Sequence, residues 1–206
     1  MSNSLAIAAV TGAMYDLLTR VGDPSPGAEP ELLGVEVTRR SLDNARRQET
    51  TSQLNLFLYQ ITKNAAISNR ESRDNSNNLY PPPLALSLHY MVTAWGKDGD
   101  ELLGHRVLGR AMRILHEHST FDPTWLTSVI AKYTELGGSD LDQQIERIRI
   151  TMQPLSLDEQ SRLWGMFQAR YHISVAYQVG VALIDSTHSR KVAPVQTATV
   201  AVRTTG

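Results

Sequence analysis

Two short clusters of polar residues are of types that bind metal ions in other proteins. The first is His116-Glu117-His118, which lies in a segment with the apolar spacing of a helix. Side chains two apart on a helix point about 200° from each other, whereas a metalloprotease helix carries its histidines four apart. The second, Asp98-Gly99-Asp100-Glu101, lacks the later glutamate and the ligand spacing of a calcium loop. We therefore expect acids at a helix start and cations at a helix end, and no metal site.

The sequence lacks the motifs of the common enzyme classes. It contains no glycine-rich dinucleotide fingerprint, no Walker phosphate loop and no Gly-x-Ser-x-Gly nucleophile turn. The absence of cysteine also excludes thiolate zinc sites, iron–sulfur clusters and a cysteine nucleophile. His89 and His172 lie on expected strands, where we interpret them as hydrogen-bonded packing residues. We predict a protein that is not an enzyme and has no cofactor.

Composition indicates one globular domain of ordinary size. The 206 residues carry a net charge of −1, with 41% apolar and 20% charged residues. A near-neutral charge disfavours general nucleic-acid binding, which depends on excess positive charge. The first apolar run has no positive charge before it and is interrupted by Asp16 and Arg20. We therefore expect neither a signal peptide nor membrane insertion, and assembly in the cytoplasm.

The apolar spacing predicts helices and strands in a mixed order. Helices are expected over 4–21, 100–118, 124–136 and 156–169, the last opened by the capping box Ser156-Leu-Asp-Glu159. Strands are expected over 32–38, 53–61, 84–95, 145–152 and 170–184. Long, half-polar strands between helices favour an α+β fold with a single mixed or antiparallel sheet flanked by helices.

The pattern also assigns particular side chains to the core. Ile148, Ile150 and Met152 are expected to point inward from the strand 145–152, because they alternate with polar residues. Trp164 and Phe167 are expected to pack against the odd-numbered face of 170–184, which carries the larger apolar residues of that strand.

Two segments do not fit this core. Residues 62–83 hold five asparagines and three consecutive prolines, which predicts a long loop that either contacts a neighbouring molecule or is disordered. We place the domain at 1–187 and an extended arm at 188–206. The arm has too few large apolar residues for a core of its own, so it either adds a strand to another subunit's sheet or is a frayed terminus. Its candidate interface residues are Val195, Thr197, Thr199, Val200 and Val202.

Charge is divided unevenly along the chain. Residues 1–38 carry one arginine against five acids, a net charge of −4, and residues 39–73 carry seven basic residues against three acids, a net charge of +4. Such a split either steers subunits together head to tail or reflects two solvated faces. The basic candidate interface residues are Arg39, Arg40, Arg46, Arg47, Arg70 and Arg73.

Several long segments resemble one known family. They are NLFLYQITKNAAISNRE (55–71), YPPPLALSLHYMVTAWG (80–96) and PLSLDEQSRLWGMFQARYHISVAYQVGVALID (154–185). GHRVLGRAMRILHEHS (104–119) and SDLDQQIERIRIT (139–151) match between them in the same order. Together they are similar to the cap, or tube-terminator, family of contractile injection systems, which are phage-tail-like particles. The match consists of strand and helix residues and contains no active site.

The resemblance implies a structural role. Proteins of this family form a six-subunit ring that ends the inner tube and links it to the last sheath layer, with a fold similar to phage tail terminators. It implies a homo-hexamer, the tube protein and the sheath protein as partners, and the sheath as the recipient of the arm. The particle would be cytoplasmic, membrane-anchored or released. The alternative is a small soluble adaptor or binding module that has no part in ending an assembly.

Overall fold

The computed structural model describes residues 3–24, 29–46, 49–65, 73–75, 78–188 and 190–191. Four α-helices lie within these ranges: α1 (Ala6–Thr19), α2 (Glu101–Glu117), α3 (Pro123–Lys132) and α4 (Leu157–Met166). The main sheet is built from β1 (Glu36–Thr38), β2 (Gln53–Lys63), β5 (Leu84–Trp95), β6 (Arg149–Gln153) and β7 (Ser174–Ile184). A second, small sheet contains β3 (Arg73–Asn75), β4 (Asn78–Tyr80) and β8 (Arg190–Lys191).

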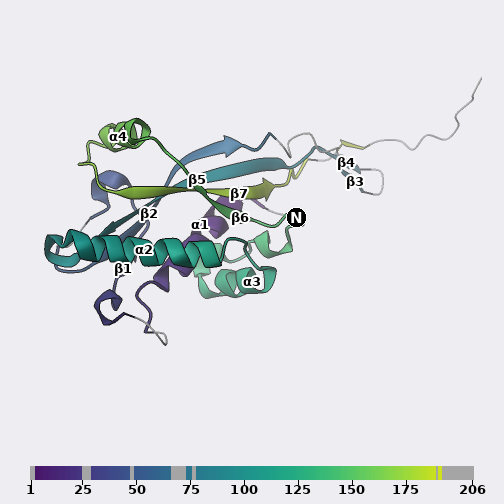
Figure 1. The fold of residues 1–206 in the computed structure, drawn as a ribbon. Helices are drawn as coiled ribbons and strands as arrows, with labels where there is room; N and C mark the ends of the chain where they lie inside the picture. Colours follow the sequence, from purple (N-terminus) through teal and green to yellow (C-terminus); the bar gives the residue numbers. More distant parts are fainter. Residues whose placement is uncertain are drawn as a thin grey trace, which may run out of the picture.

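The main sheet is mixed, and helices flank it on both faces. Its strand order is β1-β2-β5-β7-β6. All neighbouring strands are antiparallel except β1, which runs parallel to β2. Helices α1, α2 and α3 lie on one side of this sheet and α4 lies on the other (Figure 1). The predicted α+β class is therefore confirmed.

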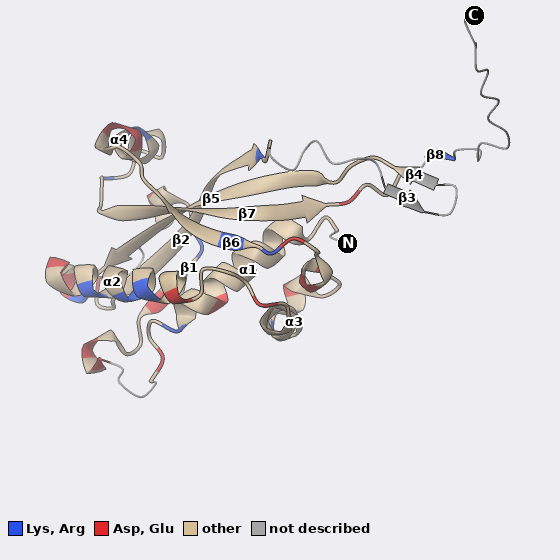
Figure 2. Ribbon diagram, turned by 45° about the vertical axis from the view of Figure 1, so that its right-hand side comes forward, with Lys and Arg blue, Asp and Glu red and all other residues tan. Residues whose placement is uncertain are grey.

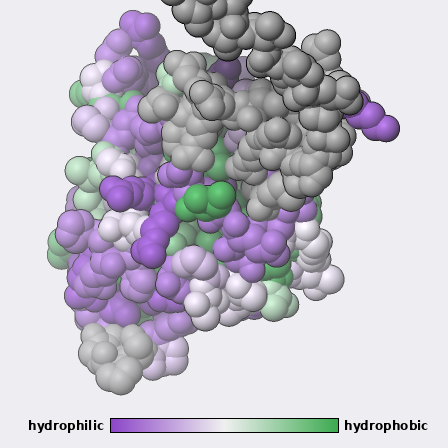
Figure 3. Space-filling model, turned by 90° about the vertical axis from the view of Figure 1, so that its right-hand side faces the viewer, coloured by the Kyte–Doolittle hydropathy of each residue, from purple (hydrophilic) through white to green (hydrophobic). Residues whose placement is uncertain are grey.

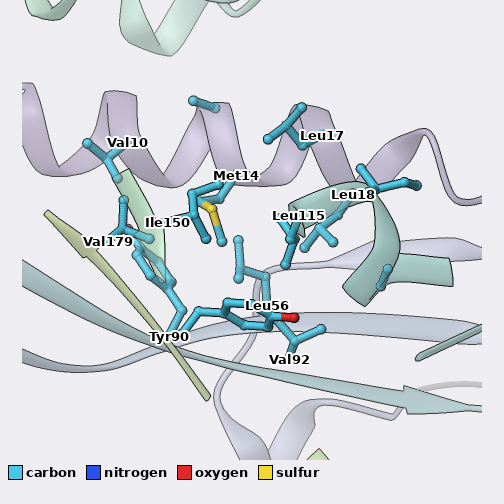
Figure 4. Packing of buried hydrophobic residues seen from close by; sticks show 14 of the residues in the cluster. Val10, Met14, Leu17, Leu18, Leu56, Tyr90, Val92, Leu115, Ile150 and Val179 are labelled. Atoms are coloured by element: carbon cyan, nitrogen blue, oxygen red, sulfur yellow. The ribbon is translucent and has the colours of Figure 1, made fainter. Parts of the chain in front are cut away.

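The principal core lies between the sheet and α1 and α2. Val10 and Met14 of α1 point toward Tyr90 of β5 and Val179 of β7 (Figure 4), and these four residues and Leu17 are buried in one cluster. The predicted helix at the N-terminus and the predicted strand 84–95 are confirmed, because their long apolar patterns meet across one interface.

A smaller core lies between the sheet and α4, and it corrects one assignment. Trp164 packs with Met91 and Leu42, and its side chain is buried. Met91 lies directly opposite Ala176 in the β5–β7 ladder, so Trp164 covers the even-numbered face of β7. The prediction that Trp164 packs on the odd-numbered face is therefore wrong, because that face is already covered by α1 and its neighbours.

Other element boundaries differ from the predicted ones at their ends. The strand predicted over 170–184 begins only at Ser174, and Tyr171 and Ile173 before it are 48% and 44% exposed. The strand predicted over 145–152 begins at Arg149, and Met152 is 56% exposed instead of buried. Met152 lies beside Tyr177 in the last strand of the sheet, at a position that the helices leave uncovered.

The chain before β1 also differs from its prediction. Pro30–Leu32 forms a 3-10 turn, and the strand is confined to Glu36–Thr38. Leu33, which lies within the predicted strand, is outside the observed one and is 48% exposed, because the turn carries it out of the strand direction.

Helix starts are fixed by side chains that accept backbone N–H groups. Asp100 accepts the N–H of Leu103 at 3.0 Å at the start of α2, and Ser156 and Glu159 form the predicted capping box of α4. Gly96 is required before α2, since a Cβ atom there would collide with the Asp100 carbonyl group. No helix within the described ranges has both the length and the apolar character for crossing a bilayer.

Candidate assembly surface

Two segments that are far apart in the sequence form a projecting three-stranded arm. β3 pairs with β4, and β4 pairs with β8 through Asn78 opposite Lys191 and Leu79 opposite Arg190. Figure 1 places β3 and β4 beyond the end of the main sheet, away from the helices. We call β3, β4 and β8 the arm sheet.

The arm sheet corrects the prediction of a long loop over 62–83. β2 continues to Lys63, and residues 73–75 and 78–80 are strands instead of loop. The three prolines Pro81–Pro83 separate β4 from β5, because proline has no N–H to continue a ladder. Arg190 and Lys191, which belong to the predicted arm 188–206, pair with β4.

At the end of the molecule that carries the arm sheet, the described part of the surface is mostly hydrophilic. Figure 3 looks onto this end and shows a small apolar area near its middle, beside atoms that are not described. Ile61 and Leu84, near the ends of β2 and β5 that lie toward the arm sheet, are 44% and 46% exposed.

Several candidate interface residues lie outside the described residues. They are Arg47, Arg70, Val195, Thr197, Thr199, Val200 and Val202. Arg73 is in β3 opposite Tyr80, but its side chain is not described. These candidates remain predictions.

The remaining basic candidates do not form one patch. The Arg39 guanidinium lies 4.2 Å from the centre of the Tyr15 ring. Arg40 donates its backbone N–H to Asn55 at 3.0 Å, and its Nη1 is buried. Arg46 lies in a different place, where Nη2 donates to the Gly96 carbonyl at 3.0 Å. Arg39 and Arg40 thus stabilise the surroundings of β1, and Arg46 holds the turn before α2.

Three of the five acidic side chains in residues 1–38 form ion pairs with basic side chains elsewhere in the chain. Lys132 Nζ donates to Asp16 at 2.6 Å, and Arg106 pairs with both Glu29 and Glu31. The hydrogen bond that Lys132 donates to Asp16 raises the pKa of Lys132, and the hydrogen bond from Arg106 lowers the pKa of the Glu29 carboxyl.

Acidic and basic residues consequently lie close together instead of on separate faces (Figure 2). Among the described residues, the paired acids of segment 1–38 do not form a free acidic patch. Head-to-tail steering by charge stays a prediction, because the side chains of Arg47, Arg70 and Arg73 in the basic segment are not described.

The two polar clusters that were considered as metal sites contribute residues to the ends of α2. Arg20 Nη1 lies 3.1 Å from His118 Nε2, and His118 Nδ1 lies 3.0 Å from the Ile114 carbonyl. The Nδ1–H tautomer satisfies both contacts, so His118 ends α2 by hydrogen bonding. Asp100 serves as the N-cap of α2. Among the described residues no group of three or more metal-binding side chains is close enough to hold an ion.

A cleft that sequence reasoning missed lies at the end of β5 away from the arm sheet. It encloses about 350 Å³ between the turn at 96–100 and residues 170–172. His172 stacks on Trp95 with ring centroids 5.2 Å apart, and its Nε2 donates to the Ala94 carbonyl at 2.7 Å. The described lining contains no nucleophile next to a base. The sequence signal for this cleft is the pair Trp95 and His172, and these two residues are too far apart in the sequence for their contact to be predicted.

Two solved structures share the fold of this chain. A cryo-EM structure of an extracellular contractile injection system, the PVC sheath/tube terminator in its extended state, matches with a TM-score of 0.62 and 16% identity over 97% of this chain. The anti-feeding prophage cap, described as the AFP tube-terminating cap, matches with a TM-score of 0.59 and 17% identity over 94% of this chain. The chain spans 64% and 60% of the lengths of those two proteins.

Sequence comparison agrees with the fold. No curated protein sequence matches the chain. A family model described as the Pvc16 N-terminal domain matches residues 9–198, which include both sheets, helices α2, α3 and α4 and most of α1. The resemblance inferred from the sequence segments is therefore confirmed, and the chain belongs to the Pvc16 N-terminal domain family.

Proposed function

We propose that this protein is the cap of a contractile injection system, where it ends the inner tube. In this proposal six copies form a ring on the last tube layer, and the ring joins the tube to the last sheath layer. Its partners are further copies of itself, the tube protein and the sheath protein. The role is structural, not enzymatic, and the protein is a component of a phage-tail-like particle.

The observation that carries the proposal is the shared fold over nearly the whole chain. The match to the PVC sheath/tube terminator covers 97% of this chain, and the anti-feeding prophage cap, a second terminator, matches as well. The surface supports the same conclusion, because an arm sheet projects from the body and the described cleft has no catalytic arrangement. A projecting sheet suits a protein that works by contacting neighbours.

The proposal is tested by imaging the particle with and without this chain. Cells that produce the particle should yield tubes and sheaths of defined length, with six-fold density for this chain at the end away from the target. Deleting the chain should give tubes of irregular length and unstable sheaths, and restoring it should reverse both effects. A ring of another order, or a location elsewhere in the particle, contradicts the proposal. If the protein is a free monomer and its deletion leaves the particle length unchanged, an adaptor is favoured instead.

A further inference from the structure

Within the described residues, one side of the main sheet is unpaired along part of β2. β1 pairs only with Gln53–Asn55, although β2 continues to Lys63. No residue in the described ranges pairs with Gln60–Lys63 on the side away from β5. We call Gln60–Lys63 the open edge. A register shift at Tyr59 separates it from the first half of β2.

The open edge presents backbone groups that can bond to another strand. The Asn64 N–H donates to the Ala85 carbonyl of the β5 side at 2.8 Å. Because the direction of bonding alternates along a strand, Ile61 and Lys63 direct their N–H and C=O groups away from β5. Ile61 is 44% exposed, whereas Leu56 earlier in the same strand is 2% exposed. An added strand would therefore gain backbone bonds and one apolar contact.

The opposite side of the sheet is closed by specific contacts. Gln144, which precedes β6 in the chain, takes the place of a strand beside the last part of β7. Its Oε1 accepts the Leu183 N–H at 2.9 Å, and its Nε2 donates to the Val181 carbonyl at 2.7 Å. β6 itself is bonded through Ile150 N–H to the Ser119 carbonyl at 2.8 Å. Pro154 follows β6 directly and limits pairing there.

We propose that the open edge binds residues 192–206 of a second copy of this chain as an added strand. The proposal rests on the ring that is part of the proposed function. It names the contact by which one subunit holds the next. The resemblance implied the sheath as the recipient of this segment, but the chain itself contains a suitable acceptor.

The donor has a composition that suits an added strand. Residues 192–206 contain no acidic residue, and their only proline is Pro194. Valine and threonine, which favour strands, make up much of the remainder. Backbone hydrogen bonds would supply the affinity, and the position of Ile61 would select an apolar or threonine side chain.

The positions of donor and acceptor indicate a second copy instead of the same chain. In the arm sheet β8 lies at one side and β3 at the other, with β4 between them. β8 follows β7 and β3 follows β2 along the chain, so Lys191, the last described residue before 192–206, belongs to the β7 side while the open edge is on the β2 side. A donor and an acceptor on opposite sides give head-to-tail contacts, which close into a ring when the rotation allows. Fully extended, the segment would reach about 50 Å.

Single cysteines can test this pairing, because the natural chain has none. A Lys63→Cys chain is mixed with a Thr197→Cys chain and oxidised, and Val195→Cys and Thr199→Cys cover other registers. The control acceptor is Thr151→Cys, which is also exposed but lies on β6. The measurement is the initial rate of covalent dimer formation, in concentrated purified protein and in assembled particles.

We expect at least one donor position to react with Lys63→Cys faster than with Thr151→Cys by on the order of a hundredfold. Adding Ile61→Pro, which removes an outward N–H, should abolish this preference while the protein keeps its thermal unfolding temperature within a few degrees. Equal rates for both acceptors, in purified protein and in particles, would overturn the pairing. A chain that carries both Lys63→Cys and Thr197→Cys and forms the disulfide only within itself would also overturn it. Preferential capture of the donor by the sheath protein would also overturn it.

These outcomes separate the two proposals. If imaging finds no ring at the tube end but the cysteines join copies, the proposed function fails and the pairing stands. If the ring is present but its copies are not joined through Lys63→Cys, the pairing fails and the proposed function stands.

Discussion

The hydroxyl groups of Thr11 on α1 and Tyr90 on β5 lie 2.8 Å apart inside an otherwise apolar layer. Thr11 donates its own hydroxyl hydrogen to the Ile7 carbonyl at 2.9 Å, so Tyr90 is the donor in the bond between the two side chains. Tyr90 is fully buried. This bond ties the first helix to the centre of the sheet and fixes their relative position.

Replacing Tyr90 with phenylalanine should lower the free energy of unfolding by about 0.5–1.5 kcal/mol, because one buried hydrogen bond is lost while Thr11 keeps its bond to Ile7. Urea unfolding measures the change. Tyr171→Phe is the matched control, since Tyr171 is 48% exposed and should change stability by less than about 0.5 kcal/mol. Equal effects of the two variants would contradict the assigned bond.

Stability should fall at alkaline pH. Burial raises the pKa of Tyr90 well above 10.0 and raises the pKa of Tyr177 to about 12. A raised folded pKa means that the unfolded chain loses its tyrosine protons first. The stabilisation is therefore complete below pH 10 and declines as the pH rises beyond it. Unfolding curves at pH 8, 10 and 11 should show this decline, and an unchanged midpoint at pH 11 would refute it.

Trp164→Ala should cost about 3–5 kcal/mol, because a large side chain is removed from the contact between α4 and the sheet. Leu157→Ala on the same helix is the control: Leu157 is 70% exposed and its loss should cost less than about 0.5 kcal/mol. Chemical denaturation followed by circular dichroism would compare them. A cost below about 1 kcal/mol for Trp164→Ala would contradict the smaller core between the sheet and α4.

Asp16→Asn should destabilise the protein by about 1–3 kcal/mol. Its Oδ1 accepts hydrogen bonds from Lys132 at 2.6 Å and from the Tyr133 hydroxyl at 3.2 Å, and the residue is buried. Asp158→Asn, in the exposed pair with Arg162, should change stability by less than about 0.5 kcal/mol. Thermal unfolding at low salt gives the comparison, and a larger loss for Asp158→Asn would speak against the structural role of Asp16.

Gln144→Ala should cost about 1–3 kcal/mol, since it leaves the Leu183 N–H and the Val181 carbonyl without partners. It should also promote association through the newly exposed side of β7. Gln143→Ala next to it removes an exposed side chain and should be nearly neutral. Light scattering and urea unfolding would measure both effects, and identical behaviour of the two variants would exclude the role given to Gln144.

The sequence predicted the long elements well because their apolar patterns run over many residues. The strand 84–95 has the predicted bounds, and the capping box at Ser156 starts α4 as expected. The pattern does not say which helix covers which face. Small residues on the even-numbered face of β7, such as Ala176, leave room for the Trp164 indole, and the larger odd-numbered residues were mistaken for its partners.

The candidate surface was harder to predict because it depends on contacts between distant residues. Arg106 reaches Glu29 across 77 positions, and Lys132 reaches Asp16 across 116. A count of charges along the chain cannot reveal such pairs. Asn78 and Lys191 are also far apart in the sequence, so the polar pattern around Asn78 predicts a loop where the structure has a paired strand. Local polarity is common to loops and to exposed strands.

The pairing of β4 with β8 also bears on folding during synthesis. β8 begins at Arg190, only six positions after Ile184 at the end of β7. The exit tunnel of the ribosome holds several times that many residues, so β7 and β8 leave it almost together. We therefore expect the main sheet and the arm sheet to be completed in one step after both strands have left the ribosome, and not one after the other.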